Sequence, residues 1–65
     1  MATTAFDVVL KELSERRDVL AQALATGAAR DFAAYQHMCG EIRGLSNAHA
    51  IITDLVRKLE LSEDE

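Results

Sequence analysis

The chain has 65 residues, a formal net charge of −4, one cysteine and no proline. A chain of this length forms one domain at most, and such domains usually need disulfides, a metal or other subunits for stability. A single cysteine excludes an internal disulfide, and the lack of paired Cys and His ligands argues against structural zinc. We therefore expect the chain to oligomerise or to dock onto a larger body.

The charges are balanced over residues 1–59, so the whole negative excess comes from residues 60–65. A balanced body with an acidic tail lacks the clustered basic face that nucleic acid requires. No apolar run approaches the roughly 18 residues of a membrane span, and the N-terminus lacks the regions of an export signal. We expect no nucleic-acid partner and no membrane partner, and the lone thiol suits a reducing cytoplasm.

A first helix is predicted over about residues 5–26, after a short leader in which Thr4 and Asp7 resemble a capping box. Between Leu13 and Leu20 the apolar stripe is interrupted, because arginine occupies both candidate positions, 16 and 17. Either an arginine stem covers the stripe while its head reaches water, or an arginine meets an acidic group of a partner. The stripe consists of Phe6, Val9, Leu13, Leu20 and Leu24, with Leu10 and Ala23 beside it.

Gly27 is the predicted residue that ends the first helix in the left-handed conformation. A second helix is predicted over about residues 29–61, with Asp31 in its first turn and residues 62–65 as a frayed acidic tail. The predicted fold is therefore all-α, a two-helix antiparallel hairpin with a longer second helix. The apolar stripe of that helix advances by steps of three or four through Met38, Ile42, Leu45, Ala48, Ile52, Leu55 and Leu59.

Gly40 and Gly44 lie inside the second predicted helix, where each costs about 1 kcal/mol relative to alanine. Together with Ala48 they form a smooth strip at a spacing of four, along which another backbone could approach closely. We favour one continuous helix, with or without a kink near these glycines. The alternative ends a short helix at Gly40 and begins a third helix near Ser46.

The second predicted helix is about 48 Å long and the first about 33 Å, so the first cannot cover all of the second. If residue n faces about residue 56 − n, nothing in the chain is left to pack beyond Ile52. A second apolar face, formed by Val8, Val19, Phe32, Cys39 and Ile51, implies more than two helices in the finished assembly. The predicted protein interface consists of Gly40, Gly44, Ala48, Ile51, Ile52, Leu55, Val56 and Leu59.

No motif for catalysis or for binding of a cofactor or metal occurs in the sequence. Cys39 and His37 point to different sides of a helix, and His49 lies nearly three turns from Cys39. We interpret Cys39 as a small hydrophobic residue and His49 as a hydrogen-bonded interface residue, with pH sensing as the alternative for His49. Phe32 and Tyr35 are interpreted as part of the hairpin core or a plug at its end. We expect no enzymatic activity, no cofactor and no metal.

Two short motifs lie at the start of the second predicted helix: DFAxY at residues 31–35 and CGxIxGL at residues 39–45. The stretch 26–60 that contains them resembles small helical proteins encoded among the structural genes of tailed bacteriophages. This resemblance implies a virion component, bound in many copies to the head, the portal and neck, or the tail. It also implies a location in the virion, or in the host cytoplasm before assembly. It assigns no individual binding residue.

These observations lead to one favoured function and two alternatives. The favoured function is a non-enzymatic structural or assembly protein that packs as a repeated helical subunit in a larger particle, a tailed-phage virion. The first alternative is a small inhibitor or adaptor that binds a host enzyme through the exposed end of the second helix. The second is a DNA-binding regulator, which would need a basic face and a recognition helix that the sequence does not show.

Overall fold

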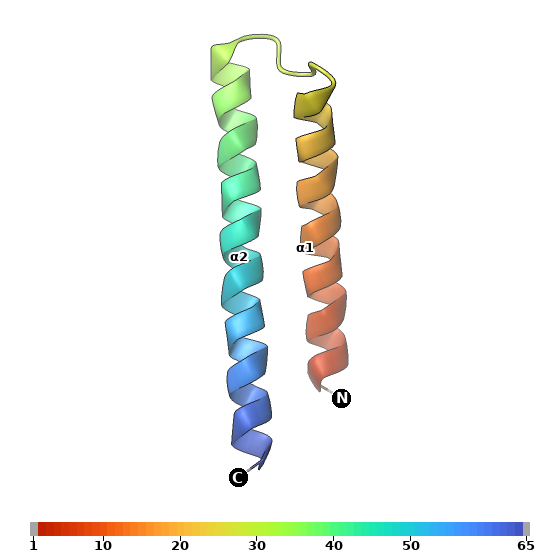
Figure 1. Cartoon of the computed structure of the whole chain (residues 1–65), viewed down its shortest axis with the longest axis vertical. Coiled ribbons are helices and arrows are strands. Elements are labelled where there is room, and N and C mark those ends of the chain that lie inside the picture. Colours follow the sequence, from red (N-terminus) through yellow and green to blue (C-terminus); the bar gives the residue numbers. More distant parts are fainter. Residues whose placement is uncertain (1, 65) are drawn as a thin grey trace.

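The computed structural model shows two antiparallel helices joined by a short turn (Figure 1). Helix α1 spans Ala2–Ala25 and helix α2 spans Phe32–Asp64. The structure describes residues 2–64, and the side chains of residues 5–62. Over this range the chain contains no strand, and the two helices pack against each other. The predicted all-α hairpin with a longer second helix is confirmed.

The helix boundaries differ from the predicted ones at both ends of the hairpin. α1 begins at Ala2, so Thr4 lies inside the helix and the predicted capping box is wrong. α2 continues to Asp64, so the predicted fraying of residues 62–64 is also wrong. Neither segment contains a glycine or proline that would stop a helix, and the helices therefore run on. Met1 of the leader and Glu65 of the tail lie outside the described residues.

The end of α1 is fixed by a Schellman motif. Gly27 has a φ of 82°, the left-handed conformation predicted for it. Its amide donates to the carbonyl of Leu24 at 3.1 Å, and the amide of Ala28 donates to the carbonyl of Ala23 at 2.9 Å. These two bonds satisfy carbonyls that would otherwise lack a partner at the end of a helix.

The start of α2 is fixed by Asp31. Its Oδ1 accepts a hydrogen bond from the amide of Ala34 at 2.8 Å. This is the geometry of an N-cap residue, whose side chain binds an amide of the first helical turn. The predicted start near residue 29, with Asp31 inside the first turn, is therefore wrong, because Asp31 stands before the helix and α2 begins at Phe32.

α2 runs without a break through Gly40 and Gly44 (Figure 1). The favoured interpretation of one continuous helix is confirmed, and the alternative with a third helix starting near Ser46 is wrong. Nothing interrupts the backbone ladder here, because glycine lacks only a side chain and keeps its amide donor.

The two helices meet along one narrow seam. Leu20, 7% exposed, is the one buried side chain among residues 5–62. In α1 the seam advances by alternating steps of four and three, which is the spacing of a two-helix contact. At this spacing the seam contains Leu10 and not Val9. The predicted placement of Val9 in the apolar stripe is therefore wrong, and its side chain is 41% exposed. The α1 seam positions are Phe6, Leu10, Leu13, Arg17, Leu20 and Leu24.

Candidate protein interface on α2

α2 carries two rows of residues that run side by side along the helix. The first row faces α1 and repeats the alternation of four and three; its members, all half-buried, are Met38, Ile42, Leu45, His49, Ile52 and Val56. The second row, which we call the α2 flank, lies beside the first and consists of Gly40, Gly44, Ala48, Ile51, Leu55 and Leu59. Within the flank only Ala48, next to the seam, is half-buried, and the other five residues are exposed.

The eight residues predicted as interface are divided between these rows. Ile52 and Val56 lie in the row that faces α1, where both are half-buried. The other six form the α2 flank, in which Ile51 is 68%, Leu55 42% and Leu59 39% exposed. The structure therefore places Leu55 outside the stripe that packs on α1, where Val56 stands in its place. The apolar surface that a partner can reach is the flank.

The two glycines of the flank face open space. A Cβ atom placed on Gly40 or Gly44 would meet no atom within 4 Å outside the neighbouring turns of its own helix. Neither glycine has a positive φ, so the backbone does not require glycine at these positions. Each lowers the stability of the helix by about 1 kcal/mol relative to alanine. No contact inside the hairpin compensates this cost, and the smooth surface that results is available to another molecule.

The C-terminal end of α2 extends beyond the start of α1 (Figure 1). The uncovered part is shorter than predicted, because α1 begins three residues earlier and each helical residue adds about 1.5 Å. Val56 is consequently half-buried, whereas Leu59 and Leu61 are 39% and 61% exposed. The predicted overhang is thus present, and it starts after Val56 instead of Ile52.

The arginine pair of α1 is divided between the seam and the surface. The Arg17 side chain is 37% exposed and its Nε lies 3.6 Å from Oδ1 of Asp18. The stem of Arg17 thus covers the seam and its head reaches water, which confirms the first interpretation for this residue. Nη2 of Arg16 lies 3.9 Å from Oε2 of Glu41 on the opposite helix. The positions of Arg16 and Glu41 agree with the predicted register of the two helices to within one residue.

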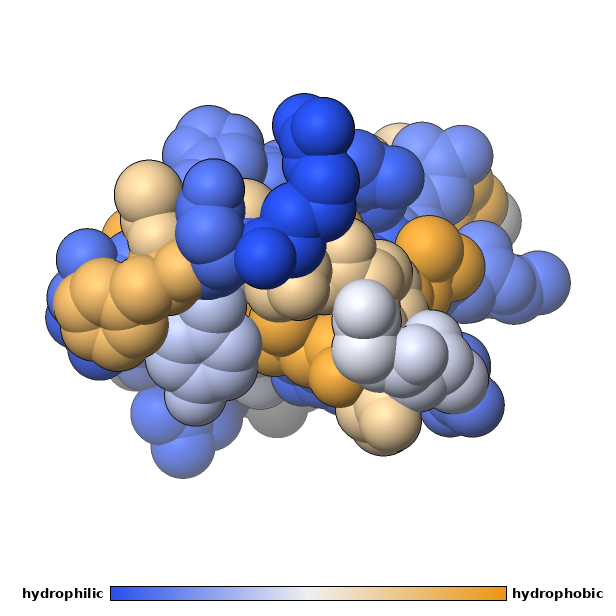
Figure 2. All heavy atoms as spheres, turned by 90° about the horizontal axis from the view of Figure 1, so that it is seen from above, coloured by the Kyte–Doolittle hydropathy of each residue, from blue (hydrophilic) through white to orange (hydrophobic). Residues whose placement is uncertain are grey.

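The turn end of the hairpin exposes aromatic side chains. Phe32 is 70% and Tyr35 48% exposed, and their rings stack with centroids 6.3 Å apart. The interpretation of these rings as core is therefore wrong, because both side chains are exposed at the turn end of α2. In a view towards the turn end of the hairpin, the surface shows orange hydrophobic residues among blue hydrophilic ones (Figure 2). Val8, Val19 and Ile51 are also exposed, as predicted for a second apolar face.

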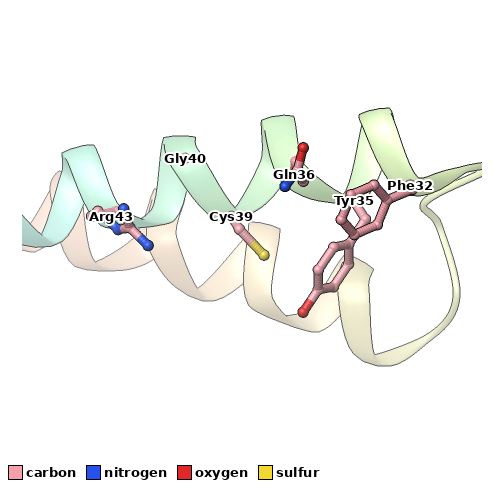
Figure 3. A pocket seen from close by; sticks show the side chains of 6 residues that line it. All are labelled: Phe32, Tyr35, Gln36, Cys39, Gly40 and Arg43. Carbon is pink, nitrogen blue, oxygen red and sulfur yellow. The ribbon is translucent and has the colours of Figure 1, made fainter.

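The aromatic pair borders an open hollow that is formed by α2 alone (Figure 3). Cys39, a free and half-buried thiol, lies one turn beyond Tyr35. Hydrogen bonding and charge interaction with Cys39 raise the pKa of Tyr35 above its ordinary value. The hollow is lined by Phe32, Tyr35, Gln36, Cys39, Gly40 and Arg43.

The remaining polar contacts of α2 stay within one or two turns. Asp54 accepts a hydrogen bond from Nη2 of Arg57 at 3.0 Å and pairs with Nζ of Lys58 at 3.1 Å. Hydrogen bonds from these two cations hold the pKa of Asp54 below its ordinary value. The Thr53 hydroxyl donates to the carbonyl of His49 at 2.8 Å and lies 3.5 Å from its Nδ1. These groups stabilise the helix surface and do not converge on a common point.

Comparison with protein-family models, curated proteins and solved structures finds no match for this chain. Among the described residues no three His, Cys, Asp or Glu side chains are placed to hold a metal ion together. Neither helix, over the part of the chain that the structure describes, is long and apolar enough to cross a membrane. The exposed large apolar side chains of α2 are Ile51, Leu55 and Leu59 on the α2 flank, Leu61 near its end, and Phe32 and Tyr35 at the turn end.

Proposed function

We propose that this chain is a non-enzymatic helical assembly protein, a repeated subunit that packs through α2 against other helices in a larger particle. The observation that carries the proposal is the imbalance between buried and exposed apolar side chains. Among residues 5–62, nine large hydrophobic side chains are between 39% and 70% exposed, whereas Leu20 alone is buried. A monomeric soluble protein rarely leaves its apolar residues in continuous exposed rows.

The shape of the hairpin also supports this function. Its Cα atoms extend over 52 × 15 × 12 Å, a rod of two helices with a seam on one side only. In four-helix bundles each helix contacts neighbours on two sides, and the core lies between the four helices. A hairpin with a second apolar row on its longer helix is half of such a core. Further helices would complete the core.

The larger particle we propose is a tailed-phage virion, on the strength of the resemblance carried by residues 26–60. Quantitative mass spectrometry of purified particles tests this directly. We expect the chain at a fixed number of copies per particle, and a Leu55→Asp variant on the flank to be lost from particles. An Ala50→Asp variant, on the exposed face away from the flank, is the matched control and should be retained.

A different result separates the proposal from its alternative. Absence of the chain from purified particles, together with stoichiometric recovery of one host enzyme on the purified chain, would contradict the structural role. It would favour the inhibitor or adaptor, which would use the same exposed end of α2. Equal retention of the Leu55→Asp and Ala50→Asp variants in particles would show that the flank is not the contact surface.

A further inference from the structure

We infer that the molecule that covers the α2 flank is a second copy of this chain, packed antiparallel with its own α2 flank in contact. This inference rests on the proposed function, because it names the partner of the same surface. Three observations carry it: the distribution of large and small residues along the flank, the charges beside it, and the surface area of the hairpin.

The flank has one half of large side chains and one half of small ones. Towards the C-terminus it presents Ile51, Leu55 and Leu59, and towards the turn it presents Gly40 and Gly44. The large half projects into solvent, with Ile51 68% exposed. The small half leaves space above the backbone, since an added Cβ would meet nothing within 4 Å. One surface thus carries both the projecting side chains and the depression that fits them.

An antiparallel arrangement brings these halves together. With Ala48 near the two-fold axis, Leu55 of one copy lies opposite Gly40 of the other, and Ile51 lies opposite Gly44. A closed two-fold dimer requires such self-complementarity, because each copy contributes the same surface. A parallel arrangement would instead place Leu55 against Leu55 and Gly40 against Gly40. The helices would then be held apart at one end, which leaves a gap at the other.

The charges beside the flank favour the same arrangement. Arg43 and Asp54 lie on one side of the flank, the side turned away from α1. Within residues 5–62 Arg43 makes no ion pair with its own chain. A two-fold axis perpendicular to the helices places this side of one copy next to the same side of the other copy. Arg43 of one copy then lies beside Asp54 of the other, and the dimer contains this pair twice. Complementary charges at the rim fix the register of an interface.

The surface area of the hairpin agrees with one such interface per chain. The chain exposes 5011 Å² at a mass of 7.1 kDa, whereas a compact folded monomer of this mass exposes about 4,100 Å². The excess of about 900 Å² is close to the roughly 800 Å² that each partner buries in an interface of standard size. The same register also brings the uncovered end of α2 alongside residues 32–39 of the other copy, which shelters Leu59.

The oligomeric state of the purified full-length chain tests the inference. We expect sedimentation equilibrium to show a dimer for the unmodified chain and a weaker one for Gly44→Leu. A leucine here occupies the space of the Ile51 side chain at both ends of the dimer, and we expect the dissociation constant to rise at least about 30-fold. Circular dichroism should show unchanged helix content, because leucine is a better helix former than glycine and has free space in the hairpin. Gln22→Leu, at an exposed position of α1, is the control and should dimerise normally.

Disulfide trapping tests the direction of packing. In a Cys39→Ser background, Ala48→Cys near the two-fold axis should form a covalent dimer within minutes of mild oxidation. Leu55→Cys alone should not, whereas an equimolar mixture of Leu55→Cys and Gly40→Cys should form the mixed dimer. Rapid self-linking of Leu55→Cys would show parallel packing and overturn the inference.

The failure of this inference is distinguishable from the failure of the proposed function. A chain that stays monomeric at the highest concentration reached in sedimentation equilibrium would overturn self-association. If the same chain is still incorporated into particles, and Gly44→Leu is not, the flank binds a different protein and the assembly role stands. If the chain is monomeric and also absent from particles, both proposals fall.

Discussion

Replacement of Leu20 by alanine measures how much of the stability of the hairpin comes from its seam. Leu20 is 7% exposed, and the substitution removes three carbon atoms from an almost fully buried side chain. At about 0.8 kcal/mol per buried methylene, the lost transfer free energy is about 2.4 kcal/mol. A cavity left by the substitution would add to this loss, but we expect that addition to be small, because a seam between only two helices can close around the smaller side chain. We expect a total loss of about 2–3 kcal/mol.

This loss is a large part of the stability available. A chain of this length is stable by roughly 3–10 kcal/mol. Urea denaturation followed by circular dichroism at 222 nm should therefore show a midpoint about 2 M lower for Leu20→Ala, at a slope of about 1 kcal/mol/M. The unmodified chain and the variant should be compared at the same chain concentration, because any self-association adds to the apparent stability.

Val19 provides the matched control. It is the preceding residue on the same helix turn, but it is 58% exposed. Val19→Ala removes apolar atoms from solvent-facing surface and introduces a better helix former, so the change in stability should stay within about 0.5 kcal/mol. Equal losses for Val19→Ala and Leu20→Ala would refute the assignment of the seam, since only one of the two side chains can face α2.

Changes at four further positions test other parts of the structure. Gly27→Ala should cost about 1–2 kcal/mol in urea denaturation, because its φ of 82° is strained for a residue with a side chain; a cost below 0.3 kcal/mol would contradict the left-handed cap. Asp31→Ala should cost about 1 kcal/mol through loss of the bond to Ala34, whereas Asp31→Asn, which keeps the acceptor, should cost little. The lowered pKa of Asp54 means that its stabilising pairs are complete above about pH 3.9 and are lost as the pH falls through the lowered pKa. When helix content is followed during an acid titration, the unmodified chain should lose helix as Asp54 is protonated, and Asp54→Asn should lack this step. Identical titration curves for the two chains would argue against the pairs. Truncation after Ala50 should abolish incorporation into particles while some helix remains by circular dichroism; normal incorporation would refute the role of the flank.

The helical hairpin could be predicted from the sequence because its signals are local. Absence of proline, the glycine at position 27 and the apolar spacing on both sides of it suffice for two helices and a turn. The boundaries could not be fixed in the same way. An acidic residue such as Asp31 is favourable both as an N-cap and in the first turn of a helix. Only its hydrogen bond to the amide of Ala34 distinguishes the two positions.

The candidate interface was predictable only in part, because apolar residues occur in neighbouring pairs along α2. Ile51 stands next to Ile52, and Leu55 stands next to Val56, so steps of three and four can follow either row. Which row packs inside is decided by the position of α1 across the whole seam. The alternation of four and three from Met38 was the signal for the inner row, and it places His49 and Val56 there. Burial by another helix is a property of the assembled pair, not of either sequence segment.

The caps on both sides of the turn have a consequence for how the hairpin folds. The Schellman bonds of Gly27 and the side chain of Asp31 involve residues at most five positions apart, so they can form before the helices meet. Each further pair along the seam then closes a loop only slightly larger than the last, and the entropy of closure rises slowly. We therefore expect folding to start at the turn and to proceed towards the open end, on the microsecond to millisecond timescale of topologies rich in local contacts. The open end closes last, which leaves the far part of α2 accessible to a second chain throughout.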